Sequence, residues 1–136
     1  MKIIACIDDN GGMMFNHRRQ SRDRTVIADI IETVNGSKLY IDGYSETLFA
    51  DYKGSYTVDS DMLEIANHED FCFIENKYLG QVAHKIDGII LYRWNRRYPS
   101  DFDFDLDLDS FGFSLISTSD FEGYSHDKIT KEIFIK

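Results

Sequence analysis

The sequence has one proline, two cysteines and no hydrophobic run long enough to span a membrane. Its apolar stretches stay well below the roughly 18 residues that a membrane helix needs. The apolar stretch that opens the chain ends at Asp8 and Asp9, and it is shorter than the roughly 7–15 residues of a signal-peptide core. We therefore expect a cytoplasmic protein with no membrane segment.

Residue patterns that would indicate a metal or redox site are missing. Cys6 and Cys72 lie inside apolar runs without a CxxC spacing, which is typical of buried, reduced thiols. The histidines show neither HxH nor HExxH spacing, so we expect surface or locally bonded side chains: His17, His68, His84 and His126. The chain also lacks a P-loop, a GxGxxG fingerprint and a GxSxG elbow. The sequence predicts no bound metal and no cofactor.

Basic residues are fewer than acidic ones. The chain has 15 Lys and Arg against 24 Asp and Glu, which gives a net charge of −9 at pH 7. Phosphate backbones select basic surfaces, so nonspecific binding to nucleic acid is disfavoured. The acidity suits solubility or a basic partner.

What the chain does contain indicates an ordered α/β protein. With 136 residues, ten Phe and eight Tyr, it can bury one core, and we predict a single domain over residues 1–136. The stretch Phe71–Trp94 reads as the strand FCFIE, the helix NKYLGQVAHKI and the strand DGIILYRW. Two apolar strands joined by an amphipathic crossover predict parallel strands of one sheet.

The remaining patterns fill in a mixed sheet. Met1–Ile7 reads as a buried strand, Asp8–Gln20 as a loop, and Ser21 as the N-cap of a helix that ends near Val34. Shorter elements are predicted at 38–42, 45–50, 55–58 and 61–67, and an antiparallel pair at 112–117 and 128–135. The fold class is therefore α/β, with a mixed, mainly parallel sheet, flanking helices and a C-terminal antiparallel strand pair.

All seven arginines fall in two clusters. Arginine grips carboxylate or phosphate through a planar fork, and both clusters follow strand ends, where open α/β sheets bind ligands. We predict an anion or acidic-partner site formed by Arg18, Arg19, Arg22, Asp23, Arg24, Arg93, Trp94, Arg96, Arg97 and Tyr98. The alternative is that both clusters are solvated loop charges; contact with RNA is a minor variant of the site hypothesis.

Asp23 is the candidate general acid or base of this site. Arg22 and Arg24 flank it in the sequence and would keep it ionised, which favours a structural or ligand-orienting role over proton donation.

Five aspartates alternate with apolar residues from 101 to 109: Asp101, Asp103, Asp105, Asp107 and Asp109. Period two predicts a strand with every carboxylate on one face. A calcium loop of the helix-loop-helix type is excluded, because positions six and twelve are Leu106 and Gly112. The segment is either a solvated edge strand whose charges prevent aggregation or a docking edge for a basic partner or a divalent cation.

The order of elements resembles dihydrofolate reductase over most of the chain, with a shortened middle. The segments that carry the resemblance are MKIIACIDD, KLYIDG, FCFIE, GIILYRW, FGFSLIS and HDKITKEIFIK. The resemblance implies a reductase-like fold in which the first strand and GIILYRW are parallel neighbours, so that the two arginine clusters would meet.

The cofactor motifs that the resemblance implies are altered. Gly43-Tyr44-Ser45-Glu46-Thr47 stands where that family has Gly-Arg-x-Thr for the cofactor phosphate, and Glu75-Asn76 replaces its Gly-Gly. Side chains and a negative charge take the place of bare backbone, so we expect nicotinamide binding to be lost.

The chain is also similar to small uncharacterised bacterial proteins that sometimes carry a ribonuclease Z label. That class needs an HxHxDH metal motif, which is absent, so its activity does not follow. We expect a non-catalytic binder of an anionic ligand at the arginine loops. The alternatives are an acidic inhibitor or immunity-type protein, and a residual reductase or RNA-processing enzyme that uses the same cleft.

Overall fold

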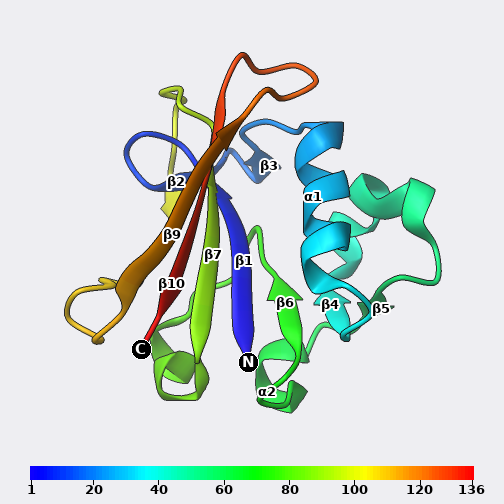
Figure 1. Ribbon diagram of the computed structural model, residues 1–136, viewed down its shortest axis with the longest axis vertical. Coiled ribbons are helices and arrows are strands. Elements are labelled where there is room, and N and C mark those ends of the chain that lie inside the picture. The colour runs from blue at the N-terminus through cyan, green and yellow to red at the C-terminus, as the bar shows by residue number, and fades with distance from the viewer.

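The computed structural model describes all residues from 1 to 136 and is built around one twisted sheet (Figure 1). Seven strands follow the order β5-β4-β6-β1-β7-β10-β9. Their bounds are β1 Lys2–Ile7, β4 Leu39–Ile41, β5 Thr57–Val58, β6 Phe71–Phe73, β7 Gly88–Arg93, β9 Ser114–Phe121 and β10 Ile129–Ile135. The predicted fold class is confirmed, since β10 runs antiparallel to both β7 and β9 while the other pairings are parallel.

The central position of β1 explains its continuous apolar sequence. It pairs in parallel with β6 on one side and β7 on the other, so both of its faces are covered. The two strands of Phe71–Trp94 are therefore parallel, as predicted, but β1 lies between them. β1 and β7 are direct neighbours, which brings the loops after Ile7 and Arg93 to the same end of the sheet.

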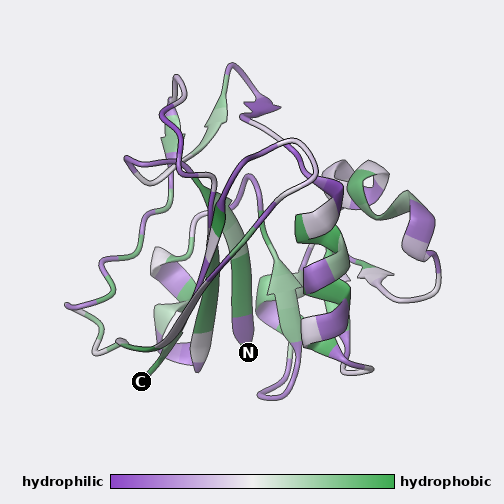
Figure 2. Cartoon of the chain, turned by 45° about the horizontal axis from the view of Figure 1, so that its top comes forward, coloured by the Kyte–Doolittle hydropathy of each residue, from purple (hydrophilic) through white to green (hydrophobic).

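Each face of the sheet carries its own hydrophobic cluster. On one face, helix α1 (Arg24–Val34) packs through Val26, Ile27 and Ile30. On the other face lie helix α2 (Met62–Ile65) and the 3₁₀ helix η2 (Gly80–Lys85). Figure 2 shows hydrophobic residues in the central strands and hydrophilic ones along the outer ribbons and loops. A further 3₁₀ segment, η1 (Gly43–Tyr52), contacts α1.

The prediction of a loop over Asp8–Gln20 is wrong, because residues 12–19 form a β-hairpin. Strand β2 (Gly12–Phe15) pairs with β3 (Arg18–Arg19) and with β8 (Phe102–Asp103) in a second sheet. Asn16 and His17 form its two-residue turn at φ of 52° and 61°, a backbone that asparagine tolerates well. Strand β3 consists of two arginines, so it lacks the alternation of apolar and polar residues by which a strand is predicted.

Two helix predictions need correction. Helix α1 is capped by Asp23 and not by Ser21, because the Asp23 carboxylate accepts the Thr25 N–H at 2.9 Å. The crossover helix predicted over residues 76–86 is the shorter 3₁₀ helix η2. Leu79 precedes this helix and Gly80 begins it. Their N–H groups donate hydrogen bonds to the carboxylate of Asp105, at 2.8 and 3.1 Å.

The strand predicted over residues 101–109 is also wrong beyond β8. The alternation of burial is real, since Leu106 is buried between exposed Asp105 and Asp107. The carboxylates, however, bind their own chain: Asp101, Asp103, Asp105 and Asp107 accept hydrogen bonds from Asn16, Ser100, Leu79 and Ser110. Hydrogen bonds to neighbouring residues and to two distant segments, the β2–β3 turn and the start of η2, take the place of pairing as a continuous strand.

No helix has the length and apolar character that crossing a bilayer would require.

Candidate functional site

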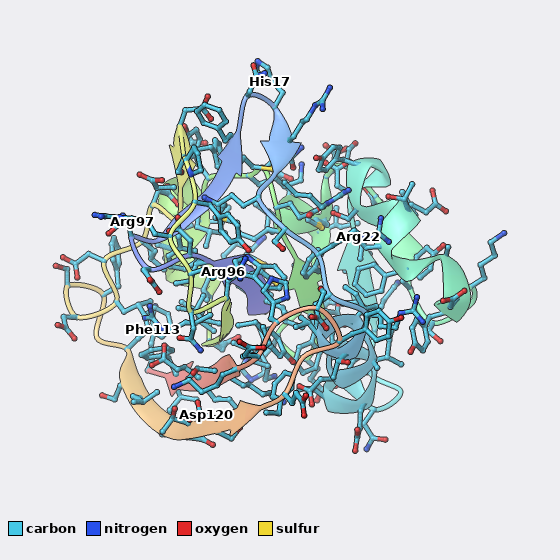
Figure 3. The ribbon with its side chains drawn as sticks, turned by 90° about the horizontal axis from the view of Figure 1, so that it is seen from above. His17, Arg22, Arg96, Arg97, Phe113 and Asp120 are labelled. Carbon is cyan, nitrogen blue, oxygen red and sulfur yellow. The ribbon has the colours of Figure 1, made fainter.

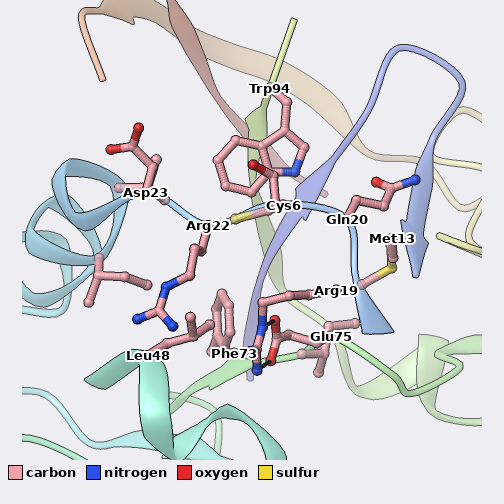
Figure 4. Close-up of a pocket in the computed structure, with 14 residues that line it drawn as sticks. Cys6, Met13, Arg19, Gln20, Arg22, Asp23, Leu48, Phe73, Glu75 and Trp94 are labelled. Atoms are coloured by element: carbon pink, nitrogen blue, oxygen red, sulfur yellow. Dashed lines mark hydrogen bonds and ion pairs between the residues drawn. The ribbon is translucent and has the colours of Figure 1, made fainter. Parts of the chain in front are cut away.

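A narrow cavity opens at the carboxyl ends of the central strands, between β1, β6, helix α1 and the segment before it (Figure 4). The cavity has a volume of about 20 Å³, which is room for little more than one water molecule, and it opens to solvent on one side. Apolar walls come from Val26, Ile27, Leu48 and Phe73. Of the predicted site residues, four line this cavity: Arg19, Arg22, Asp23 and Trp94.

Arg19 crosses the mouth of the cavity and is held there by Glu75. Its Nε and Nη2 donate to the two Glu75 carboxylate oxygens at 2.8 and 3.1 Å, and its guanidinium lies 4.5 Å from the Tyr44 ring centre. Ser45 Oγ donates to the same carboxylate at 2.7 Å. The hydrogen bond that Arg19 donates to Glu75 raises the pKa of the Arg19 guanidinium, so Arg19 stays charged and paired.

This network occupies the two turns that the dihydrofolate reductase resemblance singled out. Glu75 follows β6, and Tyr44 and Ser45 follow β4. In the sequence these residues are departures from the cofactor motifs of that family. Only the fold brings Tyr44, Ser45 and Glu75 together with Arg19.

Arg22 differs from Arg19 because it is exposed to solvent and forms no salt bridge within the chain. Figure 4 shows its side chain extending along the cavity toward Leu48. Beside it, Gln20 Nε2 donates to Asp8 and to the Pro99 carbonyl. These two acceptors fix the amide orientation and leave Gln20 Oε1 buried without a hydrogen-bond donor. The cavity thus contains one unpaired cation and one unsatisfied acceptor.

Asp23 is ionised, as predicted, but its neighbours in the sequence are not the reason. The side chain is 3% exposed, and burial alone would raise its pKa. Hydrogen bonds from His126 and from the backbone of Ser125, Tyr124 and Thr25 outweigh burial and hold the pKa of Asp23 well below its usual range. The carboxylate therefore ties the loop between β9 and β10 to the start of α1.

His126 is the residue of this site that sequence analysis missed. Its Nδ1 lies 2.8 Å from Asp23 Oδ2, and its Nε2 lies 2.9 Å from Ser21 Oγ. The ring stacks on Trp94 with centroids 4.6 Å apart, and the Tyr98 hydroxyl is 3.4 Å from Nε2. No local sequence pattern predicts this contact, because more than a hundred residues separate His126 from Ser21 and Asp23.

The other arginines do not converge on the cavity. Arg18 is exposed at the hairpin tip, Arg24 lies over the Tyr124 ring, and Arg93 is paired with Glu132 across β7 and β10. Arg96 lines a separate hollow with Trp94 and His126, and Figure 3 shows Arg97 on the opposite side of the top face from Arg22. The two clusters therefore share one end of the sheet, with Trp94 between them, and their guanidinium groups do not meet at one point.

Cys6, which lines the cavity, offers little reactivity of its own. Burial raises the pKa of the Cys6 thiol, and the nearby Glu75 and Asp23 carboxylates raise it further, so Cys6 remains a thiol. No three His, Cys, Asp or Glu side chains gather in a way that could hold a metal ion.

Comparison with known proteins identifies the fold. A dihydrofolate reductase from Enterococcus faecalis, solved with NADP(H) and RAB-propyl, superposes with a TM-score of 0.71 over 98% of this chain and 94% of that chain. The identity is 11%, so the likeness concerns the fold alone. No family model matches the sequence, and no curated protein matches it. The chain has a dihydrofolate reductase-like fold.

Proposed function

We propose that this protein binds a small anionic organic molecule at the opening of the cavity, beside exposed Arg22, and has lost the nicotinamide binding of the reductases it resembles. The observation that carries the proposal is Arg22, a guanidinium without an acidic partner beside the apolar surfaces of Leu48 and Phe73. Such a pairing of one cation with apolar walls suits a carboxylate or phosphate group on an apolar body.

The cofactor part of the proposal is supported by Glu75 and Arg19. A dinucleotide needs bare backbone and free N–H groups near its phosphates. Here a carboxylate that is 8% exposed stands after β6 and is already bound by Arg19 and Ser45. Admitting a pyrophosphate would require breaking this network and bringing two anions together.

The fluorescence of Trp94 provides the test, because Trp94 is the single tryptophan, is 4% exposed and lines the cavity. We expect saturable quenching by at least one of succinate, benzoate and phenyl phosphate. Arg22→Gln should weaken that binding about tenfold or more, whereas Arg18→Gln, an exposed arginine that does not line the cavity, should not. Absence of saturable quenching by all three anions would reject the ligand part. Saturable micromolar binding of NADPH would reject the loss of the cofactor.

A further inference from the structure

The side chains of Ser21, His126 and Asp23 form a continuous hydrogen-bonded chain that ends at the cavity. Ser21 Oγ is 2.9 Å from His126 Nε2, and His126 Nδ1 is 2.8 Å from Asp23 Oδ2. Ser21 is partly exposed and lines the cavity, whereas Asp23 and His126 are buried. The nucleophile, the base and the acid that orients the base thus follow one another at the spacing that nucleophilic catalysis requires.

The protonation pattern of this chain follows from its acceptors. Ionised Asp23 can only accept hydrogen bonds, so His126 carries its proton on Nδ1 and donates it to Oδ2. The Nε2 lone pair then faces Ser21 and accepts the hydroxyl proton. Trp94 stacks on the imidazole and Asp23 receives additional N–H groups from Tyr124 and Ser125, so ring and carboxylate are both fixed.

A purely structural role for His126 would explain its contact with Asp23, but it would not explain its contact with Ser21. The loop between β9 and β10 is already anchored by the backbone donors of Tyr124 and Ser125 on Asp23, without the contact between Nε2 and Ser21. The N–H groups of Arg22 and Asp23 follow Ser21 directly and donate no hydrogen bond within the chain. In the proposal that follows, they are the donors assigned to stabilise negative charge on an oxygen bound next to Ser21 Oγ.

We propose that Ser21, His126 and Asp23 form a hydrolytic site for small carboxylic esters. Ser21 Oγ attacks the ester carbonyl carbon while its proton passes to His126 Nε2. The bond to the leaving alcohol then breaks, and His126 returns the proton to the alcohol oxygen, which leaves an acyl-serine. Water, deprotonated by His126, releases the carboxylic acid and restores Ser21. Asp23 acts as a positioning residue for the imidazole.

The substrate preference rests on the proposed function, because Arg22 would bind an anionic group on the ester. An ester whose acyl part ends in a carboxylate fits the pairing of Arg22 with the apolar walls of Leu48 and Phe73. We therefore expect p-nitrophenyl hemisuccinate to be hydrolysed at least about tenfold faster, in kcat/KM, than the neutral p-nitrophenyl butyrate. Arg22→Gln should remove this preference.

The decisive experiment treats the full chain with a fluorophosphonate probe. An activated serine displaces fluoride and keeps the phosphonyl group, which peptide mass spectrometry locates. We expect the label on Ser21, and we expect Ser21→Ala and His126→Gln each to lower hydrolysis about 100-fold or more. Ser119→Ala, on exposed β9, is the matched control. Asp23→Asn should lower kcat and leave KM nearly unchanged. Circular dichroism checks that each variant is folded.

The outcomes separate this inference from the proposed function. If folded Ser21→Ala hydrolyses both esters as fast as the original protein, or if the label lies on another serine, the hydrolytic site is refuted even when succinate still quenches Trp94. If Ser21 is labelled and hydrolysis does not depend on Arg22 or on the charge of the ester, the hydrolytic site stands and the anion site fails.

Discussion

At the scale of single residues, the ion pair between Arg19 and Glu75 closes the cavity. Glu75 lies 8% exposed and depends on Arg19 and Ser45 for its hydrogen bonds. Buried ion pairs add little net stability compared with apolar side chains, but removing one partner leaves an uncompensated charge. The two residues are therefore coupled, and the loss of either one is worse than the loss of both.

Replacing Arg19 tests this coupling. We expect Arg19→Ala to lower the free energy of unfolding by about 2–3 kcal/mol, because the Glu75 carboxylate loses its charged donors. The double variant Arg19→Met with Glu75→Leu should cost clearly less. Urea unfolding provides the measurement, and Arg18→Ala, on the same hairpin and exposed, is the control. Equal losses in the single and double variants would contradict the coupling.

Asp23 confers a pH dependence whose sign follows from its depressed pKa. The stability it contributes is present above the pKa of an unfolded aspartate, about 3.9, and is lost as the pH falls toward the lower folded value. We expect urea unfolding between pH 5 and pH 2.5 to show a steeper loss for the original protein than for Asp23→Asn. Exposed Asp51→Asn should keep the original slope. Parallel pH profiles for the original protein and Asp23→Asn would be evidence against the hydrogen-bonded carboxylate.

At the scale of elements, the loop between β9 and β10 determines the geometry of the site. It brings Tyr124, Ser125 and His126 over the N-terminus of α1. Gly123 lets the loop approach, because a Cβ atom there would stand 2.6 Å from Asp23 Oδ2 and 3.0 Å from the His126 carbonyl oxygen. The close approach of the backbone explains why glycine is needed at this position.

We predict that Gly123→Ala displaces the loop from Asp23 and destabilises the protein by about 1–3 kcal/mol, as overpacking does. Thermal unfolding gives the stability, and the His126 side-chain NMR signals report the lost contact with Asp23. Gly43→Ala is the matched control, because its Cβ would meet nothing within 4 Å. A Gly123→Ala variant as stable as the control, with unchanged His126 signals, would show that the loop has room to spare.

At the scale of the whole molecule, an acidic chain folds with most of its carboxylates exposed, apart from buried Asp8, Asp23, Asp70 and Glu75. The net charge is −9, and Asp107 and Asp109 remain exposed on the segment that follows β8. Like charges on a compact surface repel one another and oppose folding until salt screens them.

Raising NaCl from about 0.05 to 0.5 M, which shortens the screening length well below 10 Å, should therefore raise the melting temperature by a few degrees. The double variant Asp107→Asn with Asp109→Asn should melt higher at low salt and respond less to added salt. Differential scanning calorimetry measures both effects. A melting temperature that falls with salt would mean that favourable ion pairs outweigh the repulsion.

The sequence by itself predicted the α/β class, the parallel strands of the crossover and the antiparallel pair at the end. Hydrophobic periodicity is a local property, and each of these elements buries a face that the local pattern records. The resemblance to dihydrofolate reductase adds the expectation that nicotinamide binding is lost, because Glu75 and Asn76 stand where that family has Gly-Gly. The sequence did not predict the β2–β3 hairpin, because the polar residues of β3 show no hydrophobic periodicity.

The tertiary structure alone decided which polar side chains meet. Arg19 is bound to Glu75, Arg22 is left unpaired, and His126 joins Ser21 to Asp23 from the far end of the chain. These contacts depend on β1 lying between β6 and β7 and on the β9–β10 loop reaching α1. Contacts between distant residues depend on how the strands are ordered, and local periodicity does not specify that order.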